Sequence, residues 1–168
     1  LDLMGPAMKV AGDLMSIPDI IEPSDTSLGN EEHMVDGFKK AILMVAGSAV
    51  QKLMQSLAKE QEVLMNIADM AIWTYLAESV YLRVQKKINS QGEAACEHDI
   101  AIAKTYFYDV ADKIAKAAKD AINSYAEGDE ARMMLMGLKR FTKTQPFNPK
   151  AARQIIAQKL IEDGRYKF

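Results

Sequence analysis

The sequence predicts an all-α protein, an antiparallel helical bundle of three long helices followed by one or two short C-terminal helices. Three observations favour this fold class. Apolar residues recur every three or four positions over long segments, as on one face of a helix. Glycine, proline or polar runs separate these segments. No segment of the 168 residues alternates as a strand does.

Residues 1–30 precede the first expected long helix. Apolar side chains are frequent up to residue 15, but Gly5-Pro6 and Gly12 argue against a long regular helix there. Residues 16–30 have the composition of a linker, with Pro18, Pro23 and Gly29. We therefore expect the compact part of the chain to begin near residue 31.

The first long helix is expected over residues 31–58. Asn30 is a candidate N-cap, and Glu31 and Glu32 fall in the first turn, where acidic groups complement the helix dipole. The expected buried stripe consists of Phe38, Ile42, Val45, Ala49, Leu53 and Leu57. The polar run at residues 59–62 restarts the pattern and predicts a tight corner.

The second long helix, over residues 60–90, is the one around which we expect the rest to be organised, because neither Gly nor Pro interrupts it before Gly92. A helix of this length spans about 45 Å and needs long neighbours beside it. Its expected buried stripe consists of Leu64, Ile67, Ala68, Ala71, Ile72, Tyr75, Leu76, Val80, Val84 and Ile88.

The third long helix is expected over residues 93–126. Its apolar stripe consists of Cys96, Ile100, Ala103, Phe107, Val110, Ala111, Ile114, Ala118, Ala121 and Tyr125. Frequent alanine on this stripe predicts a close approach of neighbouring helices, with Ala111 and Ala118 on the inner face.

Two short helices are expected to follow. Gly128 is a natural helix end, and Asp129 is expected to cap a fourth helix that reaches about Thr142. Asn148-Pro149 then supplies an N-cap with proline at the first helical position, and Gly164 ends this fifth helix.

The composition is that of an ordinary soluble globular chain, 49% apolar and 26% charged. The net charge of −2 argues neither for nor against nucleic acid, and we expect no such partner. Basic residues gather at the end, eight Lys or Arg against two acids from Lys139 onward.

The single cysteine, Cys96, excludes an internal disulfide and fits a reducing compartment. No run of eighteen uncharged apolar residues predicts a membrane-spanning helix. The start at Leu1, without an initiator Met, suggests a fragment of a larger protein.

No constellation of catalytic or metal-binding residues is recognisable. His33 and His98 lie far apart, and neither belongs to the Glu-x-x-His pair of di-iron bundles. Residues 97–99 (Glu-His-Asp) resemble a ligand cluster, but adjacent residues of a helix point in different directions. Cys96 lies on the apolar stripe, so a buried and unreactive thiol is expected. We therefore predict no catalytic, cofactor-binding or metal-binding residue in this chain.

Methionine is abundant, with eleven residues, most of which we expect to fill gaps in the core. Met133, Met134 and Met136 cover several faces of the expected fourth helix, and Trp73 lies off the main stripe of the second. We predict that these four residues form a packing interface that a partner surface covers.

The stretch KEQEVLMNIADMAIWTYLAESVYLR, residues 59–83, is similar to the second long helix of the domain appended to acyl-CoA dehydrogenases of the very-long-chain type. The matching positions are Glu60, Gln61, Leu64, Ile67, Ala68, Asp69, Ala71, Ile72 and Tyr75. The closing stretch, residues 141–168, also resembles the tails of bacterial members of this extended class.

The resemblance implies an FAD-dependent parent enzyme of fatty acid β-oxidation that desaturates acyl-CoA thioesters and passes electrons to an electron-transfer flavoprotein. In that family the catalytic base and the flavin contacts precede this domain, so no catalytic residue is carried over. Residues 1–30 would be the exit from the catalytic region plus a linker, and residues 31–168 the C-terminal helical-bundle domain. That domain packs on the catalytic region, shapes homo-oligomerisation and has been linked to membranes.

Two other functions stay open. One is a free-standing adaptor or assembly module, with the methionine-rich fourth helix as its docking face. The other is a peripheral membrane module that uses the basic tail and the amphipathic fifth helix, in which Ile155, Ile156, Leu160 and Ile161 oppose Lys150, Arg153 and Lys159. A cytoplasmic bacterial location is the corresponding expectation, at the inner membrane surface if the module is peripheral.

Overall fold

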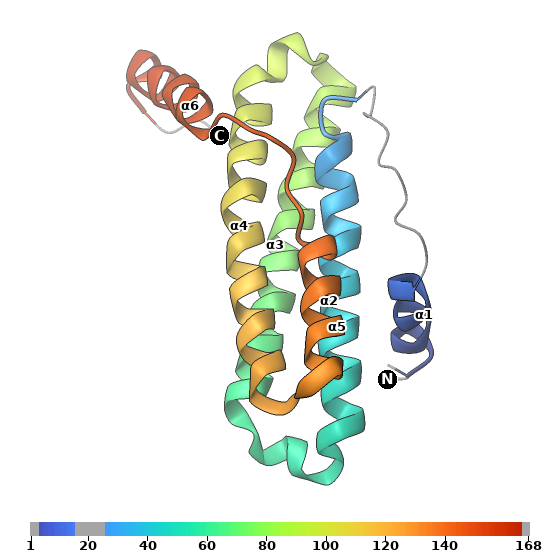
Figure 1. The fold of residues 1–168 in the computed structure, drawn as a ribbon. Coiled ribbons are helices and arrows are strands. Elements are labelled where there is room, and N and C mark those ends of the chain that lie inside the picture. Colours follow the sequence, from blue (N-terminus) through green and yellow to red (C-terminus); the bar gives the residue numbers. More distant parts are fainter. Residues whose placement is uncertain (1–3, 16–25, 166–168) are drawn as a thin grey trace.

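The computed structural model describes residues 4–15 and 26–165, and these are helical without any strand (Figure 1). Three long helices, α2 (Gly29–Leu53), α3 (Gln61–Gln91) and α4 (Glu97–Tyr125), run antiparallel side by side. Shorter helices accompany them: α1 (Met4–Met15), α5 (Gly128–Phe141), α6 (Pro149–Asp163) and the 3₁₀ helices η1 (Met54–Lys59) and η2 (Ala94–Cys96). The predicted fold class is confirmed.

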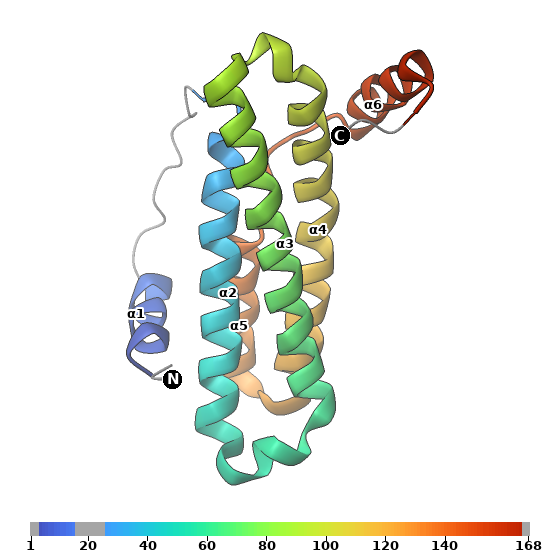
Figure 2. The same cartoon turned by 180° about the vertical axis from the view of Figure 1, so that it is seen from behind.

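Helices α3 and α5 lie on opposite sides of the bundle. In Figure 1 α5 is in front and α3 behind, and Figure 2 shows the reverse. Helix α5 packs on α2 and α4, α1 packs on α2, and α6 packs on the end of α4. The long helices therefore carry short helices on some of their faces, and this arrangement decides which surfaces stay open.

The core is centred on α4, and its predicted stripe is confirmed. All ten stripe residues are buried except Ile100, which is half-buried. Phe107 stacks on Phe38 of α2 with ring centroids 6.3 Å apart. The Tyr125 hydroxyl donates a hydrogen bond to the carbonyl oxygen of Val45, 2.9 Å away, and burial raises the pKa of Tyr125 to about 12.

Helix α2 keeps its predicted core residues Phe38, Val45 and Ala49, but its ends differ from the expectation. It begins at Gly29 rather than after an Asn30 cap, and no side chain caps it. Leu28, only 1% exposed, lies in a small apolar cluster with residues of α3 and α4, so tertiary packing fixes this start. Glu31 and Glu32 occupy the first turn, as predicted.

The predicted stripe of α3 is wrong over the first half of the helix. The buried residues are Val63, Met70, Thr74, Ala77 and Val84. Ile72 and Tyr75, expected inside, are 53% and 70% exposed. Helix α3 carries apolar residues at helical spacing on two opposite sides, and the predicted stripe follows the outer side first and the inner side after Leu76.

The expectation for the N-terminal segment is also wrong, because α1 is a regular helix of 12 residues. Pro6 lies in its first turn, where a backbone N–H would have no intrahelical partner, so the proline costs little there. Gly47 lets α1 approach α2, since a Cβ at this position would lie 2.4 Å from the Cβ of Ala7. Most of the expected linker, residues 16–25, lies outside the described residues.

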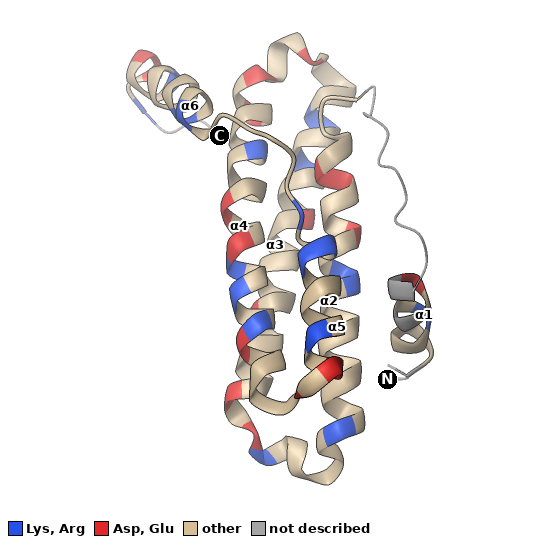
Figure 3. Ribbon diagram, viewed as in Figure 1, with Lys and Arg blue, Asp and Glu red and all other residues tan. Residues whose placement is uncertain are grey.

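The two C-terminal helices test the capping predictions. Helix α6 begins and ends as expected: the Asn148 side chain accepts a hydrogen bond from the Ala151 backbone N–H at 3.1 Å, and Gly164 adopts φ +61°. Helix α5 begins at Gly128, so Asp129 lies within its first turn and is not the cap. Acidic residues occupy the first turn of α5 and basic residues its last, as the helix dipole favours (Figure 3).

Candidate packing surfaces

The four residues predicted as an interface lie in different surroundings. Met133 and Met136, on α5, are 56% and 73% exposed, whereas Met134 is buried in the core. Trp73, on α3, is half-buried, with the Lys113 ammonium group of α4 4.1 Å from its ring centroid. The fold thus does not gather the four side chains into one patch. Their role at an interface stays a prediction, and Met133 and Met136 are the members that it leaves open to a partner.

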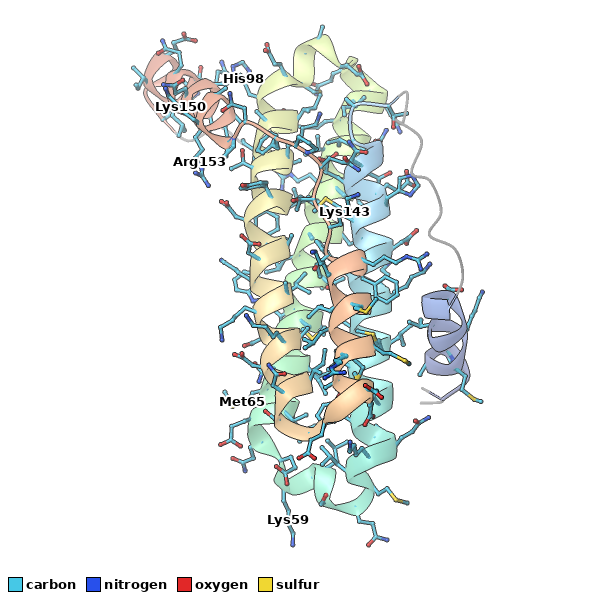
Figure 4. The ribbon with its side chains drawn as sticks, viewed as in Figure 1. Lys59, Met65, His98, Lys143, Lys150 and Arg153 are labelled. Atoms are coloured by element: carbon cyan, nitrogen blue, oxygen red, sulfur yellow. The ribbon has the colours of Figure 1, made fainter. Side chains whose placement is uncertain are left out.

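A larger apolar surface lies on α3, on the side of the bundle opposite α5. We call it the outer face of α3, formed by Leu64, Met65, Ala68, Ala71, Ile72, Tyr75, Leu76 and Leu82, all exposed. Met65 lies at the side of the bundle, toward the end that Lys59 marks (Figure 4). Sequence reasoning named most of these residues but placed them in the core. A helix apolar on two sides was the signal that could have identified them.

Among the described residues, the most deeply buried acidic group is Glu31, 7% exposed, near the start of α2. Burial raises its pKa, while its own backbone N–H and the charge of Lys104 act in the opposite direction. Its Oε2 atom has no hydrogen-bond partner among the described residues. It lines a pocket of about 80 Å³ beneath residues 144–147, where Tyr108 and Phe147 pack with ring centroids 5.6 Å apart.

The other candidate groups have ordinary structural surroundings. Cys96 is fully buried. Asp99 forms an ion pair with Lys87 at 2.7 Å, so one member of the 97–99 cluster is engaged between α3 and α4. Across residues 4–15 and 26–165, no three His, Cys, Asp or Glu side chains come together in a way that could hold a metal ion.

Among the residues that the structure describes, one segment, Gly29–Lys59, is long and apolar enough to cross a membrane by length and composition alone. The sequence predicted no such segment, because it contains no run of eighteen uncharged apolar residues. The indication is weak, because core helices of soluble proteins meet the same criterion. Here α2 supplies Phe38, Ala41, Val45 and Ala49 to the bundle core.

Residues 37–140, more than half of the chain, match the family model described as acyl-CoA dehydrogenase, C-terminal domain. The chain belongs to this domain family. A probable acyl-CoA dehydrogenase of Bacillus subtilis (strain 168) is 31% identical over 153 residues, which are 91% of this chain and 25% of that protein.

Part of a solved structure has the same fold as this chain. The crystal structure of an acyl-CoA dehydrogenase complexed with FAD from Bacillus anthracis matches with a TM-score of 0.92 and 34% identity. The match covers 100% of this chain and 28% of that one. The acyl-CoA dehydrogenase C-terminal domain thus spans about a quarter of the length of these relatives.

Proposed function

We propose that this chain is the C-terminal domain of an FAD-dependent acyl-CoA dehydrogenase of the very-long-chain, extended bacterial class. One observation carries the proposal: 153 residues align with only a quarter of a probable acyl-CoA dehydrogenase. The chemistry then belongs to the other three-quarters of the parent. This domain would pack on the catalytic region and shape the homo-oligomer. Electron-transfer flavoprotein would bind the parent enzyme rather than this chain.

The pocket at Glu31 does not suit a flavin. It measures about 80 Å³, and the buried Glu31 carboxyl group lines it, so a dinucleotide is too large for this pocket. A second pocket, beside residues 143–147, measures about 600 Å³ and is open to solvent. FAD would supply hydride-accepting chemistry in the parent, and we assign none of its ligands to this chain.

Sequencing upstream of Leu1 and assaying the encoded protein test the proposal. We expect the parent to be yellow and to oxidise a long-chain acyl-CoA with electron-transfer flavoprotein as acceptor. The 168-residue chain should be colourless and inactive in the same assay. Flavin retained by this chain at stoichiometric amounts, or acyl-CoA oxidation by it alone, would contradict the proposal.

The assembly role has its own test. Removing residues 31–168 from the parent should change its oligomeric state, because the domain would no longer cover the surface on which it packs. Light scattering after size-exclusion chromatography measures this change. An unchanged mass per particle, after correction for the deleted residues, would argue that the domain does not shape assembly.

Membrane attachment through α6 is a second candidate, favoured by its position. Helix α6 projects beside the end of α4, with Ile155 and Ile161 exposed (Figure 1). Two of its basic residues are engaged within the chain, however: Arg153 pairs with Asp109 at 2.8 Å and Lys159 with Asp163 at 3.0 Å. We therefore expect weak co-sedimentation with anionic vesicles and a cytoplasmic protein. Strong, salt-sensitive binding that disappears without residues 150–168 would reverse this preference.

A further inference from the structure

The outer face of α3 has the composition of an interface centre rather than of an ordinary solvated helix surface. Tyr75 is 70% exposed, Met65 66%, Leu82 56% and Ile72 53%. Together with the small residues Ala68 and Ala71 they follow one side of the helix from residue 64 to residue 82. An aligned apolar surface of this kind marks a contact site, whereas isolated exposed apolar residues do not.

Polar groups border this face at both ends. Glu62 and Asp69 lie near its beginning, and Arg83 and Lys86 near its end. An apolar centre with a polar border is the usual arrangement at a protein–protein interface. Two acids balance two bases, so the border lacks the excess of positive charge with which a surface binds anionic lipid.

The described helices of this chain are engaged elsewhere. Helix α1 packs on α2, α5 on α2 and α4, and α6 on α4. Within residues 4–15 and 26–165, no helix lies over the outer face of α3 (Figure 2). Helix α5, which carries the exposed Met133 and Met136, lies on the other side of the bundle.

We infer that the outer face of α3 is the surface of this domain that packs against the rest of the parent polypeptide, with Ile72 and Tyr75 as its central anchors. The inference rests on the proposed function. In the solved relative this domain is 28% of a single chain, so 72% of that chain lies outside it. Covalent linkage presents such a neighbour at a high effective concentration, which favours it over a second molecule. Tyrosine and isoleucine supply the apolar area that an interface centre needs.

Thiol accessibility tests the inference, because the only cysteine of this 168-residue chain, Cys96, is fully buried. Tyr75→Cys and Leu82→Cys probe the outer face of α3. Met136→Cys and Met133→Cys on α5 test, at matched exposure, the competing surface predicted from the sequence, since Met136 is 73% exposed against 70% for Tyr75, and Met133 and Leu82 are both 56% exposed. Each variant is made in the 168-residue chain and in the full parent, and maleimide labelling rates are measured by peptide mass spectrometry.

In the 168-residue chain, the four engineered thiols should label at similar rates. In the parent, Tyr75→Cys and Leu82→Cys should label at least about tenfold more slowly, since the face must open before it reacts, while Met133→Cys and Met136→Cys change little. Full labelling of Tyr75→Cys in the parent would overturn the inference. Protection in the 168-residue chain that grows with its concentration would also overturn it, by assigning the face to a second copy.

The two failures are distinguishable. A parent that oxidises acyl-CoA but leaves Tyr75→Cys reactive contradicts the assigned surface and leaves the proposed function standing. A parent without flavin or acyl-CoA oxidation contradicts the proposed function whatever the labelling. Circular dichroism of each variant verifies that the bundle is folded, and Leu82→Cys, at the far end of the face, decides the outcome if Tyr75→Cys does not fold.

Discussion

Helices α3 and α4 have nearly the same length, 31 and 29 residues, and pack against each other, yet they differ in their outward sides. The outward side of α4 carries charged residues such as Asp109, Asp112 and Lys116, so its one apolar stripe had to be the core. The outward side of α3 is apolar. Periodicity locates the apolar faces of a helix, but it does not say whether a face belongs to the domain core or to a neighbour.

The largest difference between the two helices should appear on truncating a large apolar side chain. Phe107→Ala removes a fully buried ring of α4 that stacks on Phe38, and it should lower the free energy of unfolding by about 3–5 kcal/mol. Ile72→Ala on the outer face of α3 should stay within about 0.5 kcal/mol. Urea unfolding followed by circular dichroism measures both, and a similar loss for the two variants would remove the distinction.

The two sides of α3 itself can be compared with one residue type. Met70 is fully buried and Met65 is 66% exposed. Met70→Ala should cost about 2–5 kcal/mol because it leaves a cavity, and Met65→Ala should be near neutral. Thermal and urea unfolding of the 168-residue chain would measure the pair. The opposite order would contradict the observed burial of the two sides of α3.

Adding volume should separate the helices in the same way. Ala118, fully buried on α4, has no room for a larger side chain, so Ala118→Leu should destabilise the bundle by about 1–3 kcal/mol. Ala71→Leu places the same group on the exposed side of α3, where it should be tolerated. A shift in the melting temperature for Ala118→Leu alone is expected, and equal shifts would argue against the assigned packing.

The smallest effect concerns the hydroxyl group of Tyr125. Tyr125→Phe removes its hydrogen bond to Val45 and should cost about 0.5–1.5 kcal/mol at neutral pH. Because the folded pKa of about 12 lies above the ordinary value of 10.0, the neutral phenol is the form that the fold favours. This stabilisation is complete below pH 10 and is lost as the pH rises toward 12. The stability difference between wild type and Tyr125→Phe should shrink over that interval, and a constant difference would contradict the assignment.

The sequence predicted the fold well where local chemistry decides the structure. Asn148, Pro149 and Gly164 bound α6 through interactions within a few residues, and the polar run before Gln61 marks the corner between η1 and α3. It failed where distant contacts decide. The start of α2 depends on the burial of Leu28 against other helices, and α1 is stabilised by its approach to Gly47.

The candidate surfaces were predicted less well, for a related physical reason. Met133, Met134 and Met136 are close in sequence, and only the docking of α5 on α2 and α4 decides that Met134 is the buried one. The apolar residues of α3 were identified individually, but their exposure depends on which side faces α4. A single sequence predicts which faces of a helix are apolar. It does not identify the neighbour that covers each face.

Trp73 is an intrinsic fluorescence probe of the contact between α3 and α4. It is the only tryptophan, and the Lys113 ammonium group lies 4.1 Å from its ring centroid, across the boundary between α3 and α4. Selective excitation of this indole therefore senses the separation of these two helices and is blind to the detachment of α1 or α6. If emission and far-ultraviolet ellipticity change together during denaturation, the bundle unfolds as one cooperative unit, and if ellipticity changes first, the outlying helices melt before the α3–α4 pair.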